Sequence, residues 1–304
     1  MNPVKINHLN TEQRNPKTMM LDTLSPLEIV TIMNEEDGKI ADAIHEKLPE
    51  IARAIETIVA ALYEGGRVIY LGAGTSGRLG VLDASECPPT FSTTDEFIGL
   101  IAGGDIALRR AVEGAEDSKE LGVEDLKKQS LKKEDVVVGL AASGRTPYVI
   151  GALDYAKQLG CATIAVSCNP GSTIGQMADI AIDIAPGPEV LTGSTRLKSG
   201  TAQKMVLNML STASMVRYGK TYGNLMVDVA ATNLKLIERT VKIVQEATGC
   251  DDASAREALG RCNHKPKVAI VMILCECTHE EALKRLDNAR GFVREAIKQE
   301  NSAK

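Results

Sequence analysis

Residues 71–83 read LGAGTSGRLGVLD and place Gly72, Gly74 and Gly77 directly after the apolar run 68–71. An apolar run that ends in closely spaced glycines, with an apolar helical pattern behind them, predicts a strand, a tight loop and the start of a helix. Such a loop aims backbone N–H groups and hydroxyls at an anion, with the helix dipole behind them. We therefore expect a phosphate site at this loop.

Apolar runs alternate with helical patterns through the following part of the chain. The expected strands are 67–71, 97–102, 136–140, 162–166 and 180–184. Several of them are apolar almost throughout, as expected for parallel strands covered on both faces. The alternation predicts a doubly wound α/β fold with a mainly parallel five-stranded sheet. Its ligand is expected beyond the carboxyl ends of the strands.

Helical patterns flank this sheet. Ser25, Pro26 and Glu28 form a helix start, and a second helix over 48–63 is stopped by glycines. A longer helix is expected over 201–218, and only helical patterns follow, at 235–247, 253–262, 267–276 and 279–298. We expect a sheet domain with an N-terminal helical arm over 1–234 and a small all-helical domain over 235–304.

Composition limits the function classes. The chain has 304 residues and a net charge of −5, which disfavours a general nucleic-acid binder. The N-terminus has no apolar segment of a signal peptide, and the longest apolar run, 268–275, is too short to cross a bilayer. Seven cysteines without a CxxC pair suggest reduced thiols in a cytoplasmic protein.

A zinc site among the C-terminal cysteines and histidines is a weak alternative. Its residues would be Cys262, His264, Cys275, Cys277 and His279. The last two cysteines are two apart on an expected helix, so they point to different faces. We therefore expect no metal site.

A short motif occurs twice. Ser76-Gly77-Arg78 follows the first expected strand, and Ser143-Gly144-Arg145-Thr146 follows the third. Two such loops at strand ends of one sheet indicate a single polar ligand held from two sides, although either loop alone is better explained as a tight turn with an N-cap. The first loop also fits the dinucleotide pattern GxGxxG, but Asp95 and Glu96 precede the second strand instead of following it.

A third hydroxyl-rich loop covers 192–199 and opens a long helix. It contains Ser194 and Thr195 beside two cations, Arg196 and Lys198. It is either a solvated connection or a segment that closes over the ligand.

Two acidic clusters complete the candidate site. In 83–89, two prolines are expected to hold Glu86 in a stiff turn, and in 113–117 Gly114 suggests a bend beside Glu116. Paired carboxyls serve as general acid and base where their environments separate their pKa values.

Together these segments resemble the N-acetylmuramic acid 6-phosphate etherase family, whose catalytic domain is of the sugar-isomerase (SIS) type. The matching segments are GAGTSGRLG, LDASECPPTF, AVEGAEDS, ASGRTPY, SCNPGS, TGSTRLKSGTAQK and NMLSTASM. The resemblance runs from about Ser25 to the C-terminus. It implies a cytoplasmic homodimeric lyase of cell-wall recycling that needs no metal or organic cofactor, with a C-terminal part similar to ubiquitin-associated domains.

The resemblance also implies roles for residues. Glu86 and Glu116 correspond to the two catalytic carboxylates that break the D-lactyl ether, giving N-acetylglucosamine 6-phosphate and D-lactate. The substrate-binding positions are Thr75, Ser76, Gly77, Arg78, Ser143, Gly144, Arg145, Thr146, Ser194 and Thr195. The partner of the lactyl carboxylate stays open among Arg78, Arg145, Arg196 and Lys198. A phosphosugar isomerase and a non-catalytic sugar-phosphate sensor are the alternatives on the same fold.

Overall fold

The computed structural model describes residues 10–230 and 234–298, which gather in two compact units. The first unit contains 10–85 and 95–211, and the second contains 86–94 and 212–298. The second unit begins earlier in the chain than the expected border at residue 235, because Val227 and Val229 are buried in the core of the C-terminal helices. That residues 1–234 and 235–304 are separate functional domains stays a prediction.

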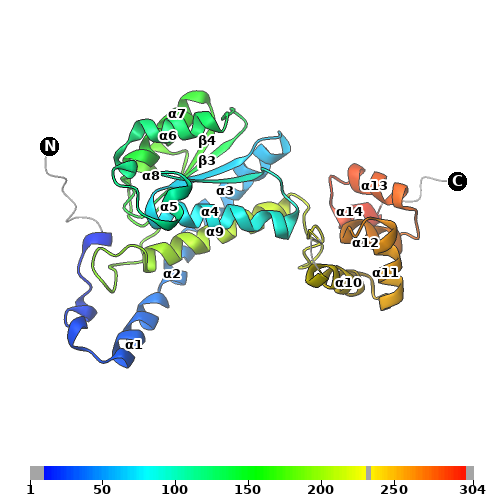
Figure 1. The fold of residues 1–304 in the computed structure, drawn as a ribbon, viewed down its shortest axis with the longest axis horizontal. Coiled ribbons are helices and arrows are strands. Elements are labelled where there is room, and N and C mark those ends of the chain that lie inside the picture. The colour runs from blue at the N-terminus through cyan, green and yellow to red at the C-terminus, as the bar shows by residue number, and fades with distance from the viewer. Residues whose placement is uncertain (1–9, 231–233, 299–304) are drawn as a thin grey trace. The chain divides into compact units, whose positions relative to one another are not determined.

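The first unit is built on five parallel strands in the order β2-β1-β3-β4-β5 (Figure 1). The strands are β1 (Val68–Gly72), β2 (Phe97–Ile101), β3 (Val136–Ala141), β4 (Ala162–Ser167) and β5 (Ile180–Asp183). All five expected strands are confirmed, and each boundary differs by at most one residue. Because β1 has β2 on one side and β3 on the other, the direction in which strands are added reverses at β1, and such a reversal leaves a crevice at the carboxyl ends of the strands.

Helices cover both faces of the sheet. Val149 and Leu153 of α7 (Pro147–Leu159) pack with Ile69 and Val137 of the sheet in one buried cluster. The opposite face carries α4 (Gly74–Phe91), where a Cβ on Gly80 would lie 3.1 Å from the Cβ of Tyr70. Figure 1 shows α6 and α7 on one side of the sheet and α4 with α9 on the other.

The other elements of the first unit precede, connect and follow the strands. They are η1 (Asn10–Glu12), η2 (Pro16–Thr18), η3 (Leu21–Thr23), α1 (Pro26–Asp37), α2 (Ile40–His45), α3 (Leu48–Tyr63), α5 (Asp105–Arg109), η4 (Ala115–Asp117), α6 (Lys119–Lys128), α8 (Thr173–Met177) and α9 (Lys198–Arg217). The expected start of α1 is confirmed, because Ser25 and Glu28 form a reciprocal capping box. Helices α4 and α9 continue into the second unit.

The described part of the second unit contains no strand, and five helices lie wholly within it. They are α10 (Leu234–Thr248), α11 (Asp252–Arg261), α12 (Pro266–Leu274), α13 (His279–Asn288) and α14 (Val293–Lys298). The expected single helix over 279–298 is wrong, because the chain leaves the helix at Arg290 and Gly291, whose φ angles are 51° and 81°. The longest apolar run forms α12 in the buried core of this unit.

Two general features of the described residues bear on function. None of their helices has the length and apolar character to cross a bilayer. All seven cysteines lie in the described residues and none of them is paired in a disulfide; that the thiols are reduced stays a prediction.

Candidate functional site

The first glycine loop brings the start of α4 against the end of β1. A Cβ on Gly77 would lie 2.5 Å from the carbonyl oxygen of Gly72, so only glycine fits this close approach. Ser76 is buried, and its hydroxyl donates to Oε1 of Gln203 at 2.7 Å. The Ser76 side chain therefore has a structural partner inside the protein. Thr75 is half-buried on the same turn and lies toward Gly200 of α9.

A cavity of about 350 Å³ opens beside this loop, at the carboxyl ends of β1 and β2. We call it the acidic cavity, because Glu113 and Glu116 line it together with Gly74 and Arg78. Most of its remaining wall is alanine, glycine and valine. The expected bend at Gly114 is confirmed by a φ of 73°, and it turns the chain into η4, which carries Glu116. Glu116 is exposed and has no hydrogen bond or ion pair with any described residue.

Arg78 reaches from α4 to the carbonyl groups of α5. Its Nε donates to the carbonyl oxygen of Leu108 at 3.0 Å, and its Nη2 donates to that of Ala107 at 2.7 Å. Two neutral acceptors fix the guanidinium without cancelling its charge. The structure therefore brings a fixed cation and the predicted catalytic Glu116 to one cavity.

The second glycine loop lines a different cavity, of about 440 Å³, at the carboxyl ends of β3 and β4. We call it the serine cavity, and Ser143, Arg145, Asn169 and Ser172 line it. Ser143 is half-buried; its Oγ accepts from the backbone N–H of Arg145 at 3.4 Å, and its hydroxyl has no acceptor among the described residues.

The backbone of the second loop is shaped for close packing. Gly144 has a φ of 69°, and a Cβ there would lie 2.3 Å from the Cβ of Ser172. Thr146 stands at the N-cap of α7, but its side chain makes no capping bond. A half-buried hydroxyl beside a helix N-terminus whose cap is unfilled offers donors to an anion.

The sequence did not indicate that the N-terminal segment reaches this cavity. Asn10 lines the serine cavity, and the neighbouring Thr11 is held by Asn169, which donates through Nδ2 to Thr11 Oγ1 at 3.3 Å. Asn169 lies in SCNPGS, which carried the family resemblance without a role assigned to it. Only the tertiary structure joins two positions that are 158 residues apart.

Hydrogen bonds to a buried glutamate hold the C-terminal end of the third loop. Glu189 is fully buried and accepts hydrogen bonds from the backbone N–H groups of Lys198 and Ser199 at 2.9 and 3.0 Å. Ser194 and Thr195 lie half-buried on the loop between these anchors, and Arg196 is exposed. This arrangement satisfies the first N–H groups of α9 with a carboxylate.

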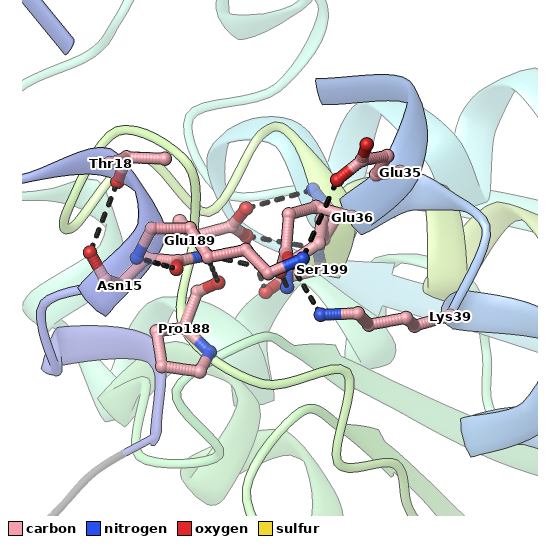
Figure 2. A network of polar contacts seen from close by, with 10 residues as sticks. Asn15, Thr18, Glu35, Glu36, Lys39, Pro188, Glu189 and Ser199 are labelled. Atoms are coloured by element: carbon pink, nitrogen blue, oxygen red, sulfur yellow. Dashed lines mark hydrogen bonds and ion pairs between the residues drawn. The ribbon is translucent and has the colours of Figure 1, made fainter. Parts of the chain in front are cut away.

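Lys198, one of the four candidate partners of the lactyl carboxylate, is already paired. Its side chain is 1% exposed, and its Nζ lies 2.9 Å from Oε2 of Glu36. Glu36 also accepts from Asn15 and Lys39, in the network of Figure 2. Burial alone would raise the pKa of Glu36, but these hydrogen bonds outweigh it and lower the pKa to about 2. Lys198 therefore belongs to a closed structural network.

The expected stiff turn at Glu86 is wrong. Glu86 lies on α4, which continues through Pro88 and Pro89 to Phe91. Proline lacks the N–H that would bond the carbonyl four residues earlier, so local rules predict a break here; the helix nevertheless continues. Glu86 is exposed and belongs to the second compact unit, whereas Glu116 belongs to the first. The proposed pair is thus not brought together within one unit.

The described residues contain no group of three or more His, Cys, Asp or Glu side chains arranged to hold a metal ion. The polar groups that line both cavities are instead hydroxyls, amides, carboxylates and guanidinium groups, which suit an uncharged or anionic organic ligand.

Comparison with known proteins agrees with this architecture. Residues 50–157 match the glucokinase regulatory protein N-terminal SIS domain, 120–213 match the SIS domain, and 223–268 match the C-terminal lid domain of glucokinase regulatory protein. A phosphoheptose isomerase structure from Francisella tularensis has a TM-score of 0.52 and 18% identity, covering 64% of this chain and 100% of that one. This likeness supports the SIS fold alone.

Similarity in sequence is much closer to proteins named N-acetylmuramic acid 6-phosphate etherase. One from Pectobacterium atrosepticum is 60% identical over 95% of this chain and 96% of that protein. Another from Brucella anthropi is 57% identical over 96% of both.

Proposed function

The chain belongs to the N-acetylmuramic acid 6-phosphate etherase family, and on this premise we propose how its two cavities divide the reaction. The enzyme is a carbon–oxygen lyase that cleaves the D-lactyl ether of N-acetylmuramic acid 6-phosphate to N-acetylglucosamine 6-phosphate and D-lactate. The acidic cavity supplies the general base, Glu116, and the serine cavity supplies phosphate binding.

The chemistry requires proton transfers at the second carbon and at the oxygen on the third carbon, first in the elimination of lactate and then in reverse, when water adds and the second carbon regains a proton. The open-chain sugar has an aldehyde at its first carbon, which acidifies the proton on the second carbon. Glu116 removes that proton, and the ether oxygen on the third carbon leaves with lactate. Glu86 protonates the departing oxygen and then activates a water that adds to the unsaturated aldehyde. Acid–base groups account for every step, so no metal or organic cofactor is needed.

The observation that carries this proposal is the placement of Glu116. It is an exposed carboxylate without an ion-pair partner among the described residues, in a cavity at strand ends beside the first glycine loop. Ordinary structural carboxylates of this chain, such as Glu36 and Asp135, are buried against cations. A carboxylate left without a partner in a cavity is available for proton transfer.

The phosphate is proposed to meet Ser143, Gly144 and Thr146. Ser143 has a hydroxyl to donate, and α7 offers N–H groups and the positive end of its dipole. Because β1 and β3 are neighbours in the sheet, the two glycine loops leave adjacent strands, about 5 Å apart. A phosphosugar therefore spans from the serine cavity to the acidic cavity.

The remaining expectations rest on the family resemblance. We propose that the enzyme is a cytoplasmic homodimer in cell-wall recycling, and that its C-terminal helices form a domain similar to ubiquitin-associated domains. Sedimentation velocity tests the dimer directly.

Turnover in oxygen-18 water tests the reaction. We expect D-lactate without the label and N-acetylglucosamine 6-phosphate with the label on its third carbon, because water adds to the sugar after lactate has left. Label in lactate would mean that the other carbon–oxygen bond breaks. An isomerised sugar phosphate would indicate an isomerase, and binding with no product would indicate a sensor.

A further inference from the structure

Arg78 is a cation that the protein holds in place but does not neutralise. Both of its protein hydrogen bonds go to backbone carbonyls of α5, those of Ala107 and Leu108. Its Nη1 has no hydrogen-bond partner among the described residues, and no described carboxylate lies within ion-pair distance of the guanidinium. The side chain is half-buried, where a charge without a partner is costly. An anionic ligand would remove that cost.

Arg78 is also the one cationic side chain among the residues that line the acidic cavity. The surrounding wall of small apolar residues, including Ala102 and Val112, screens charge less than water does. A ligand anion that enters this cavity meets Arg78 as the one cation of its lining, beside the carboxylates of Glu113 and Glu116.

We propose that Arg78 binds the lactyl carboxylate of the substrate and thereby selects a sugar that carries this group. The inference rests on the proposed function and deepens it. The substrate carries two anions, the phosphate on its sixth carbon and the lactyl carboxylate. The carboxylate is separated from the third carbon only by the ether oxygen and one further carbon, so it lies close to the carbon that Glu116 deprotonates. The phosphate lies farther along the sugar, toward Ser143.

The other three candidate cations fit this role less well. Lys198 is sequestered in its ion pair with Glu36. Arg145 lines the serine cavity, where the phosphate is proposed to bind. Arg196 is exposed and lines neither of the two cavities. The structure thus separates four candidates that the sequence treats alike.

A comparison of two ligands tests the proposal. N-acetylglucosamine 6-phosphate has the same phosphate and sugar but no lactyl carboxylate. For Arg78→Gln we expect the KM for N-acetylmuramic acid 6-phosphate to rise about tenfold or more, since a hydrogen bond between charged groups is lost. The inhibition constant of N-acetylglucosamine 6-phosphate is expected to change less than about twofold, well below that loss.

Two further variants test whether Arg78 binds the substrate or only supports α5. Arg109→Gln removes an exposed cation of α5 that does not line the acidic cavity, and its KM is expected to stay at the wild-type value. Arg78→Lys keeps the charge but loses the fork that reaches two carbonyls, so its KM should lie between those of wild type and Arg78→Gln.

Equal weakening of both ligands in Arg78→Gln, or an unchanged KM, would overturn the proposal. If the wild-type protein released no D-lactate, the proposed function would fail first. Protection from thermal unfolding by the two sugar phosphates would then still decide the role of Arg78. Stronger protection by the carboxylate-bearing sugar, lost in Arg78→Gln, supports it, and equal protection contradicts it.

Discussion

Two clusters of charged side chains in the first unit are built from distant segments, but they differ in how their charges are matched. In the network around Glu36, the carboxylate contacts Lys198, Lys39 and Asn15 (Figure 2). In the acidic cavity, Glu116 has no ion pair among the described residues, and Arg78 is held by carbonyls alone. Charges that are matched inside the protein stabilise the fold, whereas the unmatched charges of Arg78 and Glu116 in a cavity are free to meet a ligand.

The largest expected effect is on the matched network. Glu36→Gln leaves the 1%-exposed Lys198 ammonium without its carboxylate, and we expect the free energy of unfolding to fall by about 3–5 kcal/mol. Chemical denaturation measures this. Lys39→Met is the matched control, because Lys39 contacts the same carboxylate but is 53% exposed, so its loss should cost less than about 1 kcal/mol. An equal loss of unfolding free energy in the two variants would contradict the idea that the buried ion pair stabilises the fold more than the exposed one.

Low pH is expected to weaken the same network and to lower the stability of the protein. The folded-state pKa of Glu36, lowered from 4.5 to about 2, means that its stabilisation is present above pH 4.5 and is lost as the pH falls toward 2. Over this window we expect the wild type to lose about 3 kcal/mol that Glu36→Gln does not lose. Unfolding curves of both proteins between pH 5 and pH 2 measure the difference. Parallel curves would show that Glu36 is not the group that titrates.

The smallest effect separates the two glycine loops. Ser143→Ala removes a half-buried hydroxyl that lines a cavity, so we expect the KM for the substrate to rise about tenfold with little change in kcat. Ser76→Ala removes a buried hydroxyl that is already bonded to Gln203, so it should lower stability by about 1 kcal/mol and leave the KM nearly unchanged. The reverse pattern would assign the phosphate to the first loop.

Local sequence signals predicted most of the fold. Glycine loops, caps and apolar runs act within a few residues, so the five strands, the capping box at Ser25 and the helix over 48–63 were all predictable. The helix through Pro88 and Pro89 was not, because proline ordinarily ends a helix.

The candidate site was predictable as a set of residues but not as a division of roles. The repeated Ser-Gly-Arg motif suggested two equivalent loops. The Ser76 hydroxyl, however, is already hydrogen-bonded to Gln203, whereas the Ser143 hydroxyl has no acceptor among the described residues. The choice among four cations depended on partners that are far apart in the chain, such as Glu36 for Lys198. Nothing in a single sequence specifies these pairings.

The proposal that the unpaired Glu116 carboxylate is an acid–base group of the reaction is tested by measuring kcat for D-lactate release in Glu116→Gln at saturating substrate. We expect kcat to fall about a hundredfold or more while the melting temperature stays at the wild-type value, because an acid–base group is lost without a structural contact. Asp117→Asn, which alters an exposed carboxylate of η4 that lines neither cavity, is the control and should keep kcat within about threefold, well short of the loss of an acid–base group. Near-normal turnover in Glu116→Gln, or a lowered melting temperature that accounts for its lost activity, would contradict the claim.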